Sequence, residues 1–87
     1  MAETAREQVL RAARVLGRGG RTFTPREIID ELRREGSRLA DSTIRTHVTS
    51  RMCINAPEHH GTVYADLERV GAAEYRLRSA FGEEALQ

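Results

Sequence analysis

The sequence predicts an α+β domain that is mainly α, built from three helices followed by a β-hairpin. Three observations predict this class. Apolar residues recur at helical spacing in three successive segments. Two of those segments begin with helix-capping residues and are separated by a short connection. Two later runs of alternating apolar and polar residues flank a turn that contains glycine. A chain of 87 residues has room for one modest core, so we expect a single domain over residues 1–80.

The first helix is expected over Glu3–Leu16. Its apolar residues form one stripe at helical spacing: Val9, Ala12, Ala13 and Leu16. Glycines that follow directly stop the helix: Gly17, Gly19 and Gly20. The opposite face carries three arginines: Arg11, Arg14 and Arg18. This arginine stripe is either a solvated helix face or a surface that meets phosphates, and the sequence leaves both interpretations open.

The second helix has a strong start signal in "FTPREIIDELRREG". Thr24 is the expected N-cap, Pro25 the first helical residue, and Glu27 the partner of Thr24 in a capping box. The buried face of this helix carries branched aliphatic residues: Ile28, Ile29 and Leu32. Gly36 is the expected stop, and residues 22–24 before the helix predict a very short strand.

Residues 37–40 connect to the third helix, which Asp41 is expected to cap and which runs to about Met52. Two capped helices joined this closely form a helix-turn-helix arrangement. The buried side of the third helix carries apolar residues: Ile44, Val48 and Met52. Its outer side carries almost only hydroxyl residues: Ser42, Thr43, Thr46, Thr49 and Ser50. Arg45 and Arg51 lie near the two edges of that outer side.

Hydroxyl residues are mediocre helix formers, so an outer face made of them favours a binding role. In the major groove of DNA, about 12 Å wide, short side chains let the helix backbone approach the base edges. Their hydroxyls can donate to bases or phosphates, and Thr methyl groups can touch thymine methyl groups. Arg45 and Arg51 have the length to reach phosphates on either side. Solvation of this face and helix packing in a dimer are the alternative interpretations.

The hairpin is expected from two strands, Leu67–Val70 and Glu74–Arg78, joined by a turn at Gly71–Ala73. Alternation places two residues of the second strand on its buried face: Tyr75 and Leu77. Tyr64, ahead of the hairpin, is expected to support the core rather than to stack on a base. Residues 81–87 form an acidic tail that we expect to be disordered.

All 14 basic residues are arginines, which form bidentate contacts with phosphate and guanine better than lysines do. Because the formal net charge is only +1, a strongly basic protein that coats nucleic acid non-specifically is disfavoured. Residues 1–26 carry six arginines and two acidic residues, so positive charge is concentrated near the N-terminus. No apolar run has the length of a signal-peptide core or a membrane span, and the single cysteine cannot form an internal disulfide. We therefore expect a soluble cytoplasmic protein, associated with the nucleoid if it binds DNA.

In element order, and in the segments "FTPREIIDELRREG", "DSTIRTHVTSRM" and "DLERVGAAEYRL", the chain resembles the winged helix-turn-helix family over residues 3–78. It also resembles small stand-alone winged-helix modules of bacteria that have no assigned function. The resemblance implies a winged helix-turn-helix fold and a transcriptional regulator or DNA-targeting module. The third helix would enter the major groove of double-stranded DNA, and Arg69 and Arg76 of the wing would contact the backbone. The wing tip at Gly71–Ala73 lacks the usual basic residues, so deep reading of the minor groove is not expected.

Two other functional classes remain. The same fold can be an adaptor for protein–protein interaction, which the near-neutral charge favours, and a small-ligand or metal sensor is the third class. His47, Cys53, His59 and His60 could supply four zinc ligands, but their spacing matches no zinc finger, so no metal or cofactor is expected. No catalytic motif is present, and we expect no enzyme. At this net charge, useful DNA affinity would require a homodimer or a larger protein partner.

Overall fold

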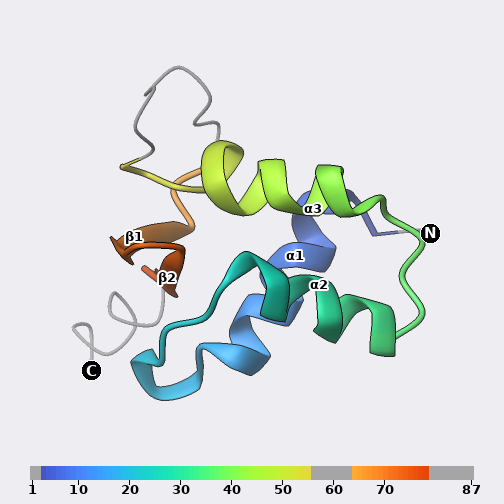
Figure 1. The fold of residues 1–87 in the computed structure, drawn as a ribbon, viewed down its shortest axis with the longest axis horizontal. Coiled ribbons are helices and arrows are strands. Elements are labelled where there is room, and N and C mark those ends of the chain that lie inside the picture. The colour runs from blue at the N-terminus through green and yellow to red at the C-terminus, as the bar shows by residue number, and fades with distance from the viewer. Residues whose placement is uncertain (1–2, 56–63, 79–87) are drawn as a thin grey trace.

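A computed structural model describes residues 3–55 and 64–78 of the chain. Within these residues it is a mainly helical α+β domain with three α-helices followed by a two-stranded antiparallel hairpin, which confirms the predicted class at this level (Figure 1). The elements are α1 (Ala5–Leu16), a 3-10 turn η1 (Arg18–Gly20), α2 (Pro25–Arg34), α3 (Asp41–Thr46), its π-helical extension η2 (His47–Arg51), β1 (Leu67–Gly71) and β2 (Glu74–Leu77). The acidic tail predicted at 81–87 lies outside the described residues.

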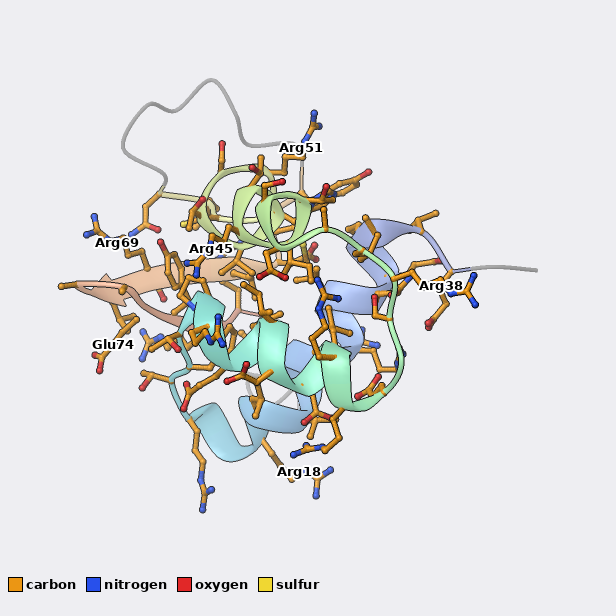
Figure 2. The ribbon with its side chains drawn as sticks, turned by 45° about the vertical axis from the view of Figure 1, so that its right-hand side comes forward. Arg18, Arg38, Arg45, Arg51, Arg69 and Glu74 are labelled. Carbon is orange, nitrogen blue, oxygen red and sulfur yellow. The ribbon has the colours of Figure 1, made fainter. Side chains whose placement is uncertain are left out.

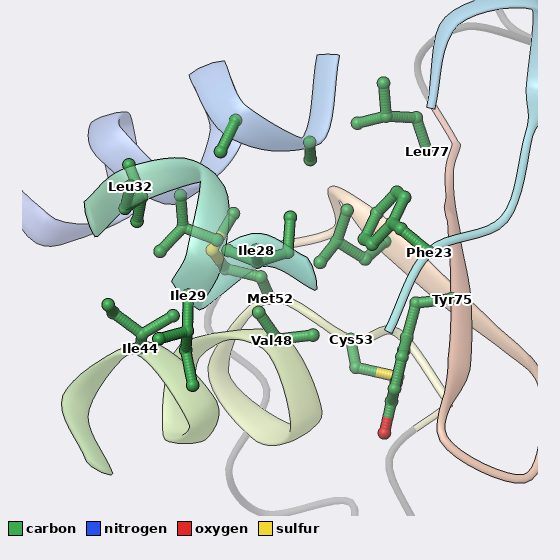
Figure 3. Close-up of a cluster of buried hydrophobic side chains, with 14 residues drawn as sticks. Phe23, Ile28, Ile29, Leu32, Ile44, Val48, Met52, Cys53, Tyr75 and Leu77 are labelled. Atoms are coloured by element: carbon green, nitrogen blue, oxygen red, sulfur yellow. The ribbon is translucent and has the colours of Figure 1, made fainter. Parts of the chain in front are cut away.

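The three helices and the hairpin pack around one apolar core. Figure 1 shows α3 and η2 along one edge of the molecule, with α1 and α2 below them and the hairpin beside the C-terminal end of η2. The core contains the predicted stripes of all three helices together with Tyr75 and Leu77 of β2 (Figure 3). Each element therefore contributes one apolar face, and this shared burial fixes which side of each helix faces solvent.

Helix α1 begins two residues later than predicted, at Ala5 rather than Glu3. The reason is a capping box that the sequence analysis did not identify. The backbone N–H of Glu7 donates to Oγ1 of Thr4, at 3.1 Å, and the N–H of Thr4 donates to Oε1 of Glu7, at 2.8 Å. Thr4 is thus the N-cap, which leaves Glu3 outside the helix.

The predicted start and stop of α2 are confirmed. The N–H of Glu27 donates to Oγ1 of Thr24, and the N–H of Thr24 donates to Oε1 of Glu27, so both halves of the capping box are present. Pro25 occupies the first turn, where no N–H is needed. Gly36 has a φ of 88°, a left-handed conformation that favours glycine and ends the helical path.

The prediction that Asp41 caps the third helix is wrong. Ala40 is the N-cap and makes no side-chain cap hydrogen bond, and Asp41 is the first helical residue. The Asp41 carboxylate is instead held by Arg33 of α2, which also donates to the Leu39 carbonyl. This ion pair ties the turn between α2 and α3 to the last turn of α2. The predicted short connection is therefore fixed by an arginine rather than by a side-chain cap.

The second half of the third helix is wound more loosely than an α-helix. The N–H of Met52 donates to the carbonyl of His47, five residues earlier, at 2.8 Å. A π turn of this kind is rare, and it rotates the residues within it away from their α-helical directions. The apolar side survives the change, because Val48 and Met52 are both fully buried.

The hairpin is joined on both sides by single backbone pairs. The strand predicted at residues 22–24 is reduced to Phe23, which pairs antiparallel with Tyr75 of β2. On the other side, Cys53 pairs in parallel with Leu67 of β1, just after the helical extension ends. Because Phe23 precedes α2 and Cys53 follows η2, these two pairs fix the hairpin to the start of α2 and to the end of η2.

The turn of the hairpin differs from the prediction in one respect. Gly71 was expected in the turn, but it belongs to β1 and pairs with Glu74. The residue with a left-handed backbone is Ala73, with a φ of 56°. A bulge between Arg69 and Gly71 shifts the register, so the chain reverses one residue later than the glycine indicates.

Candidate nucleic-acid interface

The hydroxyl side of α3 and η2 faces outward, as predicted. Ile44, Val48 and Met52 form the opposite side and are fully buried. Two of the hydroxyl residues, Ser42 and Thr46, are exposed. The other three are partly buried: Thr43, Thr49 and Ser50. The helix therefore offers this side to solvent instead of to the core.

Part of this side is hollowed into an open depression of about 360 Å³. Its lining among the described residues is Ser42, Thr43, Thr46, His47 and Arg51. Arg51 belongs to the π-helical segment η2 and lines the same depression as Ser42 and Thr46. The structure therefore brings together three predicted hydroxyl residues and one predicted arginine.

The polar groups in the depression differ in what they can still bind. Among the described residues, the hydroxyls of Ser42, Thr43 and Thr46 make no hydrogen bond, so each can donate to a ligand. Thr49, which is not part of this lining, donates through Oγ1 to the carbonyl of Arg45, at 2.8 Å, so it can only accept. His47 holds the carbonyl of Thr43 through Nδ1, at 2.8 Å; that nitrogen must carry the proton, which leaves Nε2 for a ligand.

The predicted arginines fall into two states. Arg45 and Arg51 are exposed and form no ion pair with any residue in the described ranges. Arg69 on β1 is likewise exposed and forms no ion pair there. Arg76, by contrast, donates through Nε to Oε1 of Glu68 across the hairpin, at 3.1 Å. Arg76 would have to give up this ion pair to bind a phosphate.

The free arginines point in different directions (Figure 2). Arg51 extends away from the helix at the top of the view, whereas Arg69 extends from the hairpin at the left. Arg45 is drawn at the hairpin side of α3. An extended ligand that follows α3 and η2 would therefore meet guanidinium groups at the C-terminal end of η2 and at the hairpin. A small ligand would meet at most one of these groups.

Arg69 is held in place by a residue that the sequence analysis missed. Asn55 donates through Nδ2 to the Arg69 carbonyl, at 3.0 Å, and accepts from the Arg69 N–H through Oδ1, at 2.9 Å. Asn55, Arg69, Val70 and Gly71 line a second open depression, of about 350 Å³. Burial raises the pKa of Tyr75, and the positive charge of Arg69 partly offsets the increase. Arg69 lies directly opposite Tyr75 in the register of the hairpin.

The two missed residues, His47 and Asn55, left different signals in the sequence. His47 follows Thr43 by four residues, a helical interval that could have placed it beside the hydroxyl residues that line the depression. The Asn55 side chain pairs with a backbone 14 residues later, and such a contact leaves no local pattern in the sequence. A side chain that satisfies both groups of one backbone residue can be found only from the tertiary structure.

Tyr64 is partly buried against the core, as predicted. Its ring is covered by the guanidinium of Arg6, whose carbon lies 4.6 Å from the ring centre. Arg6 also donates to both carboxylate oxygens of Asp66, at 2.9 and 2.8 Å, and this hydrogen bonding raises the pKa of Arg6. The face of Tyr64 is therefore occupied by Arg6 and unavailable to a stacked base.

Metal binding finds no support within the described ranges, where no cluster of three or more His, Cys, Asp or Glu residues could hold an ion. Cys53 is fully buried and donates through Sγ to Oδ1 of Asn55, at 3.2 Å. His59 and His60, the other members of the zinc set considered from the sequence, lie outside the described residues. None of the helices in the described part of the chain is both long and apolar enough to cross a bilayer.

Comparison with known proteins identifies a family for the chain. A family model described as a domain of unknown function (DUF7669) matches residues 4–77. The match begins at the N-cap of α1 and ends at the last residue of β2, so it spans every element described above. No curated protein and no solved structure matches the chain.

Proposed function

We propose a function for this chain, which belongs to the family described as a domain of unknown function (DUF7669): it is a winged-helix protein that binds double-stranded DNA. The observation that carries the proposal is the outward, hydroxyl-lined side of α3 and η2, with Arg45 and Arg51 free of ion pairs among the described residues. The element order of helix, single-residue strand, two helices and hairpin supports a winged helix-turn-helix arrangement.

The side chains on this helix suit a major groove. Ser42 and Thr46 are short and exposed, so the helix backbone can come close to base edges while their hydroxyls donate or accept. Arg51 at one end and Arg69 on the hairpin are placed to meet phosphates along the duplex. These contacts supply both a reading surface and an electrostatic clamp.

The hairpin is proposed to follow the DNA backbone and not to enter the minor groove. Its turn consists of Ala72 and Ala73, followed by the exposed Glu74, so it presents no positive charge to the narrow groove. Arg69 at the base of the turn forms no ion pair with a residue that the structure describes, and Arg76 is paired with Glu68. Arg69 is therefore the main phosphate contact that we assign to the wing.

Affinity for DNA should be modest and sensitive to salt. Arg45, Arg51 and Arg69 are the three arginines assigned to phosphates. Each phosphate contact lowers log K by about 0.9 for every unit of log salt, so we expect a slope of about −3 with random-sequence duplex. A steeper slope would require further contacts, such as those of a second copy of the chain.

Fluorescence anisotropy with a labelled random-sequence duplex tests the proposal. Arg45→Ala and Arg51→Ala should each weaken binding about tenfold at low salt and reduce the salt slope by about one. Thr46→Ala should weaken binding to a preferred site while leaving random-sequence binding nearly unchanged. Arg26→Ala is the matched control, because Arg26 is an exposed arginine on α2 that pairs with Asp30. If both α3 arginine variants bind duplex as the parent does, the proposal is wrong.

A second candidate function, a protein–protein adaptor, is favoured by one observation. Ile54 and Val70 are large apolar side chains that are 41% and 40% exposed. They are the chain neighbours of Asn55 and Arg69. The side chain of Asn55 pairs with the backbone of Arg69 and so joins the end of η2 to β1. A partner docked there would bind with little dependence on salt, and Val70→Ser would weaken that binding without changing affinity for DNA.

A further inference from the structure

The segment from residue 8 to residue 26 contains five arginines and no acidic residue. Two of the five are neutralised by partners elsewhere in the chain. Arg11 pairs with Glu3 and Glu35, and Arg26 pairs with Asp30. The other three are exposed and form no ion pair with a described residue: Arg14, Arg18 and Arg21. We name these three residues the basic end.

The basic end lies away from the hydroxyl side of α3. Arg14 is in the last turn of α1, Arg18 begins η1, and Arg21 follows η1 directly. In both views of the ribbon, α3 runs along the top and the η1 turn lies at the bottom (Figures 1 and 2). Figure 2 shows Arg51 pointing upward and Arg18 at the opposite end of the molecule. A straight duplex seated on α3 therefore does not reach the basic end.

We infer that the basic end is a second binding surface for the phosphate backbone of a duplex, so that one chain joins two DNA segments; this inference rests on the proposed function of α3. Arginine binds phosphate with several donors at once, and three unneutralised arginines lie within one short segment. Because phosphates repeat at a regular spacing along DNA, such a surface needs charge and little shape. It would hold DNA without reading its sequence.

An acidic protein is the less fitting partner for the basic end. Stable protein interfaces are built around a buried apolar or aromatic centre. The large apolar side chain exposed beside these arginines is Val15, at 44%, and it stands without a second exposed large apolar residue in the described part of α1 or η1. A polyanion that binds by charge needs no such centre.

A bridging assay tests the inference on the full chain. An immobilised duplex is mixed with the protein and a fluorescent duplex of different sequence, and the captured fluorescence is measured at low salt. The parent chain should capture the second duplex. The triple variant R14A/R18A/R21A should reduce capture at least tenfold while its anisotropy affinity for one duplex changes less than threefold. Arg38→Ala, which removes an exposed arginine elsewhere, is the control and should leave capture unchanged.

The outcomes separate the two proposals. If the parent binds duplex in anisotropy but captures no second duplex, the basic end is not a DNA-binding surface, while the role of α3 stands. If the parent binds no duplex at all, both proposals are overturned. If the triple variant still captures DNA, bridging comes from two copies of the chain, and the inference is wrong. A last outcome is that the parent captures no second duplex but binds a polyglutamate peptide, while the triple variant does not bind the peptide. The surface would then fit an acidic protein, which also overturns the inference. Circular dichroism of each variant confirms that the exposed substitutions leave the fold intact.

Discussion

Phe23 and Tyr75 exchange two backbone hydrogen bonds, each with an N–O distance of 2.8 Å. The N–H of each residue donates to the carbonyl of the other, so a residue just ahead of α2 is paired with the centre of β2. Both side chains are buried, at 1% and 4% exposure, and both belong to the hydrophobic core (Figure 3). This pair sets the position of the hairpin relative to the helices. Any surface that α3 shares with Arg69 of the hairpin depends on that position.

Phe23→Ala should therefore lower the free energy of unfolding by about 3–5 kcal/mol, because it removes a buried ring and leaves a cavity. Phe23→Leu keeps much of the volume and should cost less than about 2 kcal/mol. Chemical denaturation monitored by circular dichroism measures both. Thr22→Ala, an exposed neighbour, serves as the control. An unfolding free energy of Phe23→Ala close to that of Thr22→Ala would show that the ring does not anchor the hairpin.

Asn55 should be a second anchor of the hairpin. Its side chain occupies both the N–H and the carbonyl of Arg69, so Asn55→Ala should cost about 1–2 kcal/mol. Asn55→Asp keeps the acceptor but loses the donor and turns a carboxylate toward the Arg69 carbonyl, so it should be no more stable than Asn55→Ala. Thermal unfolding of the two variants, with the exposed Ser42→Ala as control, tests this order. A fully stable Asn55→Asp would mean that the Nδ2 hydrogen bond contributes nothing.

The features of this fold that are local in sequence could be predicted from the sequence. The capping box of Thr24 and Glu27 depends on residues three apart, and the stripe of Ile44, Val48 and Met52 depends on helical spacing. The alternation of Tyr75 and Leu77 predicted their burial in the same way. In each case the residues that give the signal in the sequence lie only a few positions apart and are the same residues that form the structural feature.

Other corrected features depend on contacts between different elements, although the missed capping box of Thr4 and Glu7 is as local as the one that was predicted. The pairing of Arg33 with Asp41 replaced the expected cap, and the pairing of Arg76 with Glu68 occupied one of the predicted phosphate contacts. Such ion pairs depend on how elements meet, and a single sequence contains no signal for them. The π turn of residues 47–51 was not predicted either, because no proline or glycine in this segment marks it.

Ala73 offers a stabilising substitution in the hairpin turn. Its φ of 56° is unfavourable for a residue with a Cβ atom by roughly 1–2 kcal/mol, and glycine adopts this conformation freely. Part of the gain is offset because glycine has more freedom in the unfolded chain, so Ala73→Gly should stabilise by about 0.5–1 kcal/mol. Its melting temperature should rise by a few degrees.

Ala72→Gly is the matched control for the turn. Ala72 has no positive φ, so glycine there adds only freedom to the unfolded chain and should lower stability by about 0.5–1 kcal/mol. Scanning calorimetry of the two variants gives opposite signs if the turn has the described geometry. Equal shifts for both variants would show that the left-handed residue lies elsewhere.

The carboxyl groups of Glu31 and Glu35 give the fold a dependence on pH. Their hydrogen bond raises the pKa of Glu35, and partial burial adds to the increase, while Arg11, at 2.9 Å, opposes it. A folded-state pKa above the unfolded value means that the native state binds this proton more tightly. The stabilisation is complete below the unfolded pKa of about 4.5 and is lost as pH rises through the folded pKa.

Glu35→Gln should therefore stabilise the fold at neutral pH and have no effect at low pH. At pH 7 the variant lacks the carboxylate that is disfavoured beside Glu31, so its melting temperature should exceed that of the parent. Below the unfolded pKa both side chains are neutral, and the difference should vanish. Asp30→Asn removes one negative charge from the exposed surface of α2 and loses the ion pair with Arg26, so it controls for net charge and should not stabilise at pH 7. A Glu35→Gln variant that melts below the parent at pH 7 would show that the ion pair with Arg11 outweighs the repulsion from Glu31.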